Sequence, residues 1–124
     1  MKKAAGVLLI CKRTGNFLLL KRSDQVTYSN RWAVVAGAVE KNESPLQTIK
    51  RELKEETQIP SNDIVFEFFE TQNLIRSFDL FIGYCDKEYE CILNEENSSW
   101  GWFNMNNLPT PLFPTLYSSL VKIF

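Results

Sequence analysis

The residues most able to do chemistry lie in the stretch RELKEET, residues 51–57, which brings Glu52, Glu55 and Glu56 close together. On a helix, residues three and four apart are neighbours, so these carboxylates would meet on one face and repel one another. Gathered carboxylates bind hard divalent cations, and Mg²⁺ in particular combines a few carboxylates with phosphate oxygens and water. Taken alone, the stretch has an alternative interpretation, a solvated helix whose Glu and Lys residues serve propensity and solubility.

The helix that would position these side chains is the clearest element of the sequence. Ser44 is a suitable N-cap, and Pro45 fits the first helical position, where its missing N–H costs nothing. Pro60 closes the element, because the residue before a proline avoids helical geometry. Helical spacing predicts an apolar stripe formed by Leu46, Ile49, Leu53 and the methyl group of Thr57.

The glutamates follow a definite order around this helix. On a wheel of 100° per residue, Glu56 borders the apolar stripe, Glu52 comes next and Glu55 lies furthest out. Arg51 can reach Glu55, four residues on. We therefore expect an acidic face beside the edge of the core.

The remaining elements predict an α/β (α+β) sandwich, a mixed β-sheet with helices covering its faces. We expect Phe66, Phe68 and Phe69 to be core residues of a strand. The predicted order is a hairpin over residues 4–22, a strand over 31–40 that enters a loop at Gly37, the helix, strands over 63–72 and 77–88, a short strand over 88–97 that ends in an acidic loop, a strand over 100–105, and a helix over 115–124.

Composition limits the classes of function. A chain of 124 residues has the size of a single domain, which we assign to residues 1–124, and its net charge of −1 does not suit a general nucleic-acid binder. Because the sequence has no histidine, Ser-His-Asp and Cys-His catalysis and imidazole zinc sites are excluded.

The cysteines and the N-terminal segment suggest an intracellular protein. The three cysteines are sparse and odd in number, which favours reduced thiols, although a Cys85–Cys91 pair stays open. The apolar run after the first lysines is too short for a signal peptide or a membrane span and is interpreted as a strand. We expect a cytoplasmic protein that does not bind membranes.

From Gly37 to Ile59 the chain reads GAVEKNESPLQTIKRELKEETQI. This resembles the Nudix box, G-x5-E-x7-R-E-U-x-E-E-x-G-U with U an aliphatic residue, and only Gln58 departs from it, standing where the family has its second glycine. The segments around Trp32 and after Glu95 resemble the flanking regions of the family. A left-handed glutamine at position 58 would cost on the order of 1 kcal/mol unless the turn differs.

The resemblance implies a hydrolase that cleaves a nucleoside diphosphate linked to another group, with Mg²⁺ or Mn²⁺ as cofactor and a catalytic loop-helix-loop at residues 37–59. In this family pattern Glu52, Glu55 and Glu56 bind the metal, with the main-chain carbonyl of Gly37 as a further ligand. The same pattern implies that Arg51 and Glu43 orient these carboxylates through ion pairs.

Residues outside the box also have implied roles. The general base of the family varies, either a glutamate of the box or one on a distal loop, and Glu96 is our candidate for the distal position; a merely solvated loop residue is its alternative. Arg22 matches a phosphate-contacting arginine at the end of the second strand, with a plain surface charge as its alternative. The residues considered for stacking on a base are Phe81, Tyr28 and Trp102, although Trp32 and Trp102 are expected mainly in the core.

The sequence indicates the chemistry better than the substrate. Residues 73–78, NLIRSF, lack the proline or tyrosine typical of members that cleave ADP-ribose or diadenosine polyphosphates, and the chain is short. Both features favour a MutT-like enzyme acting on nucleoside triphosphates or other small nucleotides. Nucleotide sugars, the 5′ end of RNA, and a non-catalytic nucleotide sensor are the alternatives, and a homodimer, common among relatives, stays open.

Overall fold

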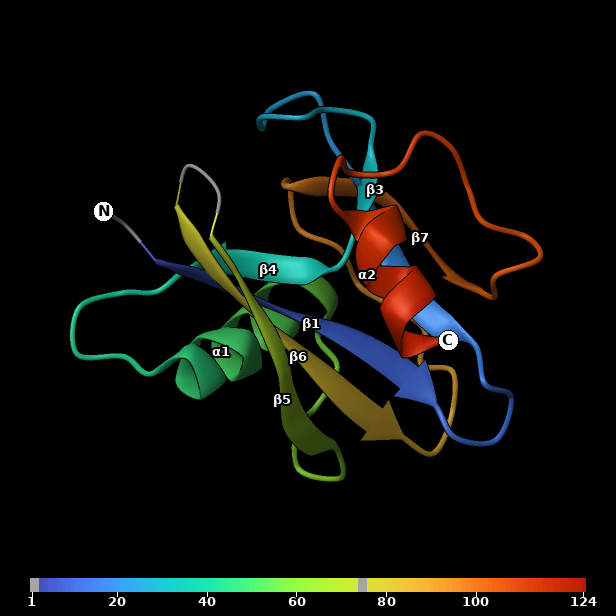
Figure 1. The fold of residues 1–124 in the computed structure, drawn as a ribbon, viewed down its shortest axis with the longest axis horizontal. Helices are drawn as coiled ribbons and strands as arrows, with labels where there is room; N and C mark the ends of the chain where they lie inside the picture. Colours follow the sequence, from blue (N-terminus) through green and yellow to red (C-terminus); the bar gives the residue numbers. More distant parts are fainter. Residues whose placement is uncertain (1–2, 74–75) are drawn as a thin grey trace.

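The computed structural model describes residues 3–73 and 76–124 of the chain. Figure 1 shows its strands and helices. The strands are β1 (Ala4–Cys11), β2 (Phe17–Arg22), β3 (Trp32–Ala33), β4 (Val35–Ala38), β5 (Val65–Asn73), β6 (Ser77–Cys85) and β7 (Asn97–Phe103), and the helices are α1 (Pro45–Thr57) and α2 (Leu116–Ile123).

The described strands form one mixed sheet with β1 at its centre. The order is β3-β2-β1-β6-β5, while β4 pairs with β1 and β7 pairs with β2. Strands β1 and β6 run parallel, whereas β1 pairs antiparallel with both β2 and β4. A mixed sheet flanked by helices was expected, and this prediction is confirmed.

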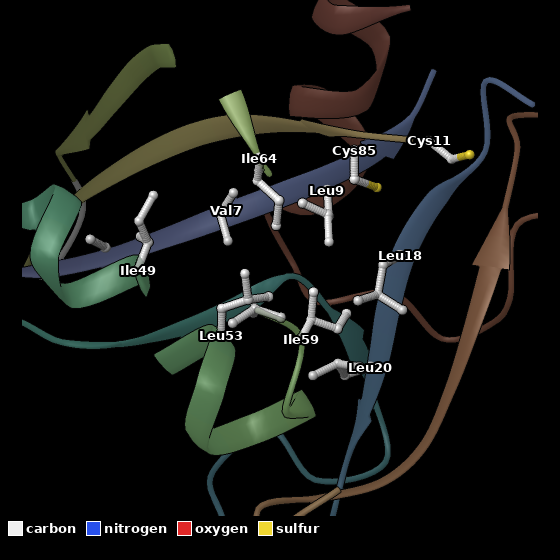
Figure 2. Packing of buried hydrophobic residues seen from close by; sticks show 12 residues of the cluster. Val7, Leu9, Cys11, Leu18, Leu20, Ile49, Leu53, Ile59, Ile64 and Cys85 are labelled. Atoms are coloured by element: carbon white, nitrogen blue, oxygen red, sulfur yellow. The ribbon is translucent and has the colours of Figure 1, made fainter. Parts of the chain in front are cut away.

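Both faces of β1 are covered, which explains why it reads as an uninterrupted apolar run. Val7 and Leu9 point toward α1 and pack with Ile49 and Leu53 of that helix, as Figure 2 shows. The alternate residues of β1 pack on the other face with Leu116 and Leu120 of α2, and the residues of that second cluster on β1 are Leu8 and Ile10. The two helices therefore lie on opposite faces of the sheet.

Helix α1 begins and ends as its sequence dictates. The Ser44 side chain accepts a hydrogen bond from the Gln47 backbone N–H at 3.1 Å, and the Gln47 side chain accepts one from the Ser44 N–H at 2.8 Å. This capping box satisfies two of the free N–H groups of the first turn. At the other end Gln58 adopts the left-handed conformation at φ 63° and donates its N–H to Lys54 O. The left-handed conformation at the end of the helix thus forms with glutamine at this position.

The buried face of α1 is rotated relative to the predicted stripe. Leu46 was expected to be buried, but 38 % of it is exposed. The physical reason is that the helix packs on β1 and β4 around Glu56 and Leu53 rather than around Leu46. The residues actually buried are Thr48, Ile49, Glu52, Leu53, Glu56 and Thr57.

The predicted strand over residues 88–97 is wrong. The chain is irregular until β7 begins at Asn97, earlier than the expected residue 100. Ile92 is exposed, so no alternating face exists there, and its N–H donates singly to Thr57 O at 3.0 Å. This irregular segment passes close to the end of α1 and delivers the acidic loop.

The prediction that Phe68 is a core residue is also wrong, since 54 % of it is exposed. Strand β5 lies at the edge of the sheet, and a register shift between Phe68 and Glu70 leaves Phe69 as an extra residue. Phe66 and Phe69 are partly buried, on opposite faces of the sheet. Phe68 is therefore exposed because its strand lies at the edge of the sheet, where no neighbouring strand among the described residues covers it.

The three cysteines were expected to be reduced thiols, with a Cys85–Cys91 pair as the alternative. Cys11, Cys85 and Cys91 are free thiols, so the Cys85–Cys91 pair is not formed. Burial raises the pKa of Cys85 to about 11 and that of Cys91 to about 12.

Within residues 3–73 and 76–124, no helix has the length and apolar character needed to cross a membrane.

Candidate active site

Three carboxylates from two distant segments converge at the site. Glu52 and Glu56 lie one turn apart on the buried face of α1, and Glu96 comes from the loop before β7. One carboxylate oxygen from each of the three lies within 4.8 Å of the other two. The loop is tied to the end of β2, because the Ser23 N–H donates to Glu96 O at 2.9 Å. The sheet thus brings Glu96, 40 residues beyond Glu56 in the sequence, to the acidic face of α1.

Glu56 is the most deeply buried of these carboxylates. Its Oε1 accepts a hydrogen bond from Asn97 Nδ2 at 2.8 Å, whereas its Oε2 is buried without a partner among the described residues. Burial raises the pKa of Glu56 well above its usual range, and the Asn97 hydrogen bond opposes that shift. A buried carboxylate oxygen without a hydrogen bond is costly unless a cation or donor meets it. The buried Oε2 of Glu56, without a partner among the described residues, is therefore the observation that supports a metal ion at Glu52, Glu56 and Glu96.

Glu52 lies directly against strand β4. A Cβ built on Gly37 would collide with the Glu52 carboxylate, so only glycine leaves room for it. Burial raises the pKa of Glu52 to about 7, the adjacent Glu55 adds to the shift, and Arg51 opposes it. The first glycine of the box therefore makes space for an acidic side chain, in addition to any role of its carbonyl.

Arg51 holds the acidic face together. Its Nε and Nη2 donate to both oxygens of Glu43 at 2.8 and 2.9 Å, and its Nη1 donates to Glu52 at 2.9 Å. Glu43 is itself fixed by the Thr48 hydroxyl at 2.6 Å. These bonds lower the pKa of Glu43 to about 2, with the Arg51 hydrogen bond as the largest cause. The hydrogen bond to the Glu43 carboxylate is the largest cause that raises the pKa of Arg51. Such a bidentate pair fixes the direction of the guanidinium.

Glu55 lies outside the group of three. Half of its side chain is exposed, and Arg51 Nη1 contacts it at 3.3 Å. The arrangement matches the predicted order on the wheel, in which Glu55 lies furthest from the core. Among the described residues the compact carboxylate group is thus Glu52, Glu56 and Glu96, whereas the sequence pattern grouped Glu55 with Glu52 and Glu56.

A cleft of about 460 Å³ opens beside the carboxylates and is lined by Glu96, Gly37 and Arg22. Nε of Arg22 donates to Thr27 O at 2.7 Å, and its guanidinium lies over the Phe113 ring at 5.7 Å. Burial lowers the pKa of Arg22, and the nearby Glu56 and Glu96 oppose that shift. Arg22 therefore presents a fixed positive charge inside the cleft.

The aromatic residues that line the cleft are partly those expected. Tyr28 lines it and packs on Phe113 with ring centroids 4.8 Å apart. Trp102 and Phe81 do not: Trp102 packs against the core and donates to Tyr89 O at 2.8 Å, while Phe81 meets Phe68 edge-on.

Sequence reasoning missed several residues of the site. Asn97, which bonds Glu56, directly follows Glu96 in the sequence, and that adjacency was its only signal. The missed residues that line the cleft are Gln72, Arg76, Phe78, Phe113 and Ser119. They come from hairpin and C-terminal segments whose side-chain direction depends on tertiary packing. Within the segment 73–78, which bore on the substrate, residues 74–75 lie outside the described part of the chain.

Comparison with known structures shows the same fold. A Nudix hydrolase from M. smegmatis superposes with a TM-score of 0.80 at 20 % identity, covering 98 % of this chain and 82 % of that one. A MutT Nudix hydrolase from Burkholderia pseudomallei gives 0.77 at 20 % identity, covering 99 % and 98 %. A C. elegans Ap4A hydrolase gives 0.66 at 25 % identity, covering 80 % and 77 %.

Sequence comparison supplies the family. A search of curated proteins gives no match. The NUDIX domain family model, by contrast, matches residues 1–122, nearly the whole chain. It spans the loop-helix-loop over residues 37–59, the carboxylates of α1 and the loop that carries Glu96. The chain therefore belongs to the Nudix family.

Proposed function

We propose that the protein is a divalent-cation-dependent hydrolase that cleaves the pyrophosphate linkage of nucleoside triphosphates or related small nucleotides. The observation that carries the proposal is the buried Oε2 of Glu56, which has no hydrogen-bond partner among the described residues and belongs to a group of three carboxylates beside a cleft. Support for the substrate class comes from relatives of the same fold, which include an Ap4A hydrolase and an E. coli dihydroneopterin triphosphate pyrophosphohydrolase.

The donor set suits a hard divalent cation. Glu52, Glu56 and Glu96 would hold it, with Glu55 and the Gly37 carbonyl as the further ligands that the family pattern implies. When bound, Mg²⁺ or Mn²⁺ would neutralise developing negative charge and lower the pKa of a coordinated water. The network of Arg51 and Glu43 keeps the carboxylates aimed in the absence of substrate.

The chain's own side chains supply the remaining steps. Glu96 takes a proton from the attacking water with the carboxylate oxygen that does not hold the cation. The water oxygen forms a bond to phosphorus while the bridging P–O bond breaks, and the electron pair of that bond leaves with the departing phosphate. Arg22 donates to a phosphate oxygen, for which its position in the cleft with a fixed guanidinium is suitable. If a box glutamate is the base instead, Glu55→Gln will lower kcat more than Glu96→Gln does.

The cleft is of the right kind for a small nucleotide. Its volume lies within the range of small-molecule pockets, and the side chains of Tyr28, Phe78 and Phe113 give it an aromatic lining. Aromatic faces can pack against a base while Arg22 meets phosphate.

The test is turnover on a panel of compounds with Mg²⁺. The panel holds nucleoside triphosphates, oxidised and methylated nucleotides, dinucleoside polyphosphates, ADP-ribose and nucleotide sugars, with phosphate read with and without added pyrophosphatase or phosphatase. We expect metal-dependent cleavage that Glu56→Gln abolishes and that Glu90→Gln, at an exposed carboxyl outside the site, retains. If the folded protein binds metal but turns over no compound, the small-nucleotide proposal fails, and capped RNA or a sensor function takes its place.

A further inference from the structure

A hydrogen-bond network on the far side of the cleft involves residues that the proposed reaction does not use. Gln72 of β5 and Ser119 of α2 both line the cleft. The Gln72 Nε2 donates to Glu70 Oε2 at 3.0 Å and to Ser119 Oγ at 2.8 Å. Glu70 also accepts from Lys122 Nζ at 2.8 Å and from the Ser119 hydroxyl at 3.0 Å. The strand and the helix are thus joined by four polar side chains.

This network fixes which way the Gln72 amide points. The ion pair with Lys122 is the largest cause that lowers the pKa of Glu70, so Glu70 is a carboxylate that can only accept. The nitrogen of the amide must therefore face Glu70, and both of its N–H groups are used. No described residue donates to the remaining Oε1 of Gln72. Toward a ligand in the cleft, Gln72 can act only as a hydrogen-bond acceptor.

An aromatic ring lies beside this acceptor. Phe78 of β6 is directly opposite Gln72 in the antiparallel pair, so the two side chains share a face. The Phe78 ring reaches across β1 at Gly6, where a built Cβ would meet its Cζ at 2.6 Å. Ala4 and Ala36, two residues with small side chains, also line the cleft. A flat apolar surface and an oriented acceptor are thus neighbours.

We propose that Gln72 is a specificity-determining residue for the base of the nucleotide, an inference that rests on the proposed function. Its carbonyl oxygen accepts a hydrogen bond from an exocyclic amino group of a base packed against Phe78. A base without that amino group leaves the acceptor unpaired in the cleft and is turned over less well, because one hydrogen bond is lost. The enzyme would therefore prefer amino-bearing bases.

The first test changes the nucleotide and leaves the protein intact. We would compare kcat/KM for ATP with that for purine riboside triphosphate, and for GTP with that for inosine triphosphate, since each pair differs by one amino group. We expect the amino-bearing member of at least one pair to be favoured about three- to tenfold, which corresponds to one hydrogen bond. Equal values in both pairs would overturn the inference.

The second test assigns the preference to Gln72. In Gln72→Leu the ratio should fall to about one, and Gln72→Met replaces it if the first variant does not fold. Ser118→Ala is the matched control, because that neighbouring serine bonds Thr115 O at 3.1 Å instead and should keep the ratio. A ratio that persists without the amide would refute Gln72 as its source.

Failure of the proposed function and failure of the role of Gln72 give different experimental results. If no nucleotide is turned over at all, the proposed function is refuted and this inference with it. If nucleotides are cleaved in a metal-dependent way but the paired substrates are equal, only the role of Gln72 is refuted.

Discussion

Glu56 shows at the scale of one residue how folding and function compete. Its Oε1 is satisfied by Asn97, while its Oε2 is buried without a partner among the described residues. Burying a polar atom without a hydrogen bond destabilises a fold by about 1–3 kcal/mol. The same atom is the one that a cation would meet. We therefore expect the residue to cost stability in the metal-free protein.

Glu56→Gln should raise the stability of the metal-free protein. The glutamine keeps an oxygen for Asn97 and places an amide N–H, which the nearby Glu52 or Glu96 carboxylate can accept, where the unpartnered oxygen stood. We therefore expect a gain of roughly 1 kcal/mol, or about 3–5 °C in Tm. The measurement is thermal unfolding in EDTA, with Glu90→Gln as control. A lower Tm for Glu56→Gln would show that the carboxyl is not under strain in the metal-free fold.

Glu43→Gln should remove a pH-dependent part of stability. Because Arg51 lowers the pKa of Glu43 to about 2, the contribution of this carboxylate is complete above about pH 4.5, its usual value, and is lost as the pH falls toward 2. The Tm difference between wild type and variant should therefore shrink between pH 4.5 and 2.

The metal affinity or turnover of Glu43→Gln should fall about ten- to a hundredfold at pH 7, because Glu43 fixes Arg51, which in turn orients the Glu52 carboxylate. A Tm difference that stays constant across the acid range would contradict the role of the ion pair.

At the scale of elements, α1 and β4 must fit one another closely. The helix presents Glu52 toward the strand, and the strand accepts it only because residue 37 is glycine. The helix then ends in a left-handed turn at Gln58, which directs the chain toward the buried Ile59. Each end of the loop-helix-loop thus depends on one backbone position.

Gly37→Ala should damage the site more than the fold. The new methyl group would displace the Glu52 carboxylate, and we expect a loss of metal affinity of about tenfold or more, by analogy with the loss of a group that orients a ligand. Titration with Mn²⁺ and circular dichroism would separate the two effects. An alanine variant with wild-type metal affinity would show that Glu52 can relax elsewhere.

Gln58→Gly should stabilise the protein by about 1 kcal/mol, because glycine adopts the left-handed conformation without a Cβ clash. We expect Tm to rise by about 3–5 °C. Lys54→Gly is the matched control: the same new residue inside α1 should lower stability by about 1 kcal/mol. If both variants lower Tm, the glutamine turn is not strained.

At the scale of the whole molecule, the site exists only because the sheet joins distant segments. Arg22 ends β2, Glu56 lies on α1 and Glu96 precedes β7, which pairs with β2. Helix α2 and strand β5 close the opposite side of the cleft through Gln72 and Ser119. A ligand in this place therefore contacts elements from most of the chain.

Metal binding should accordingly stabilise the entire fold. At a hundred times the dissociation constant, Mn²⁺ or Mg²⁺ should add about 2.7 kcal/mol, and EDTA should reverse the effect. Glu96→Gln should reduce the shift in Tm, whereas Glu88→Gln, on a loop that bonds Thr14 and Asn16, should not. An equal shift in both variants would exclude Glu96 from the metal site.

The sequence alone was sufficient for the features set by local rules. Ser44 and Pro45 begin α1, the spacing of glycine, arginine and glutamates indicates the family, and the order of periodic segments indicates a mixed sheet with two helices. Capping, helical spacing and apolar runs act between residues a few positions apart, so they can be recognised without coordinates.

Tertiary structure decided the features that depend on register and on rotation of elements. It buried the glutamate side of α1 instead of Leu46, exposed Phe68 on an edge strand, and left residues 86–96 without a strand. It also placed Glu96 rather than Glu55 beside the other two carboxylates. These outcomes result from packing between segments far apart in the chain, where a shift of one residue reverses which face is buried.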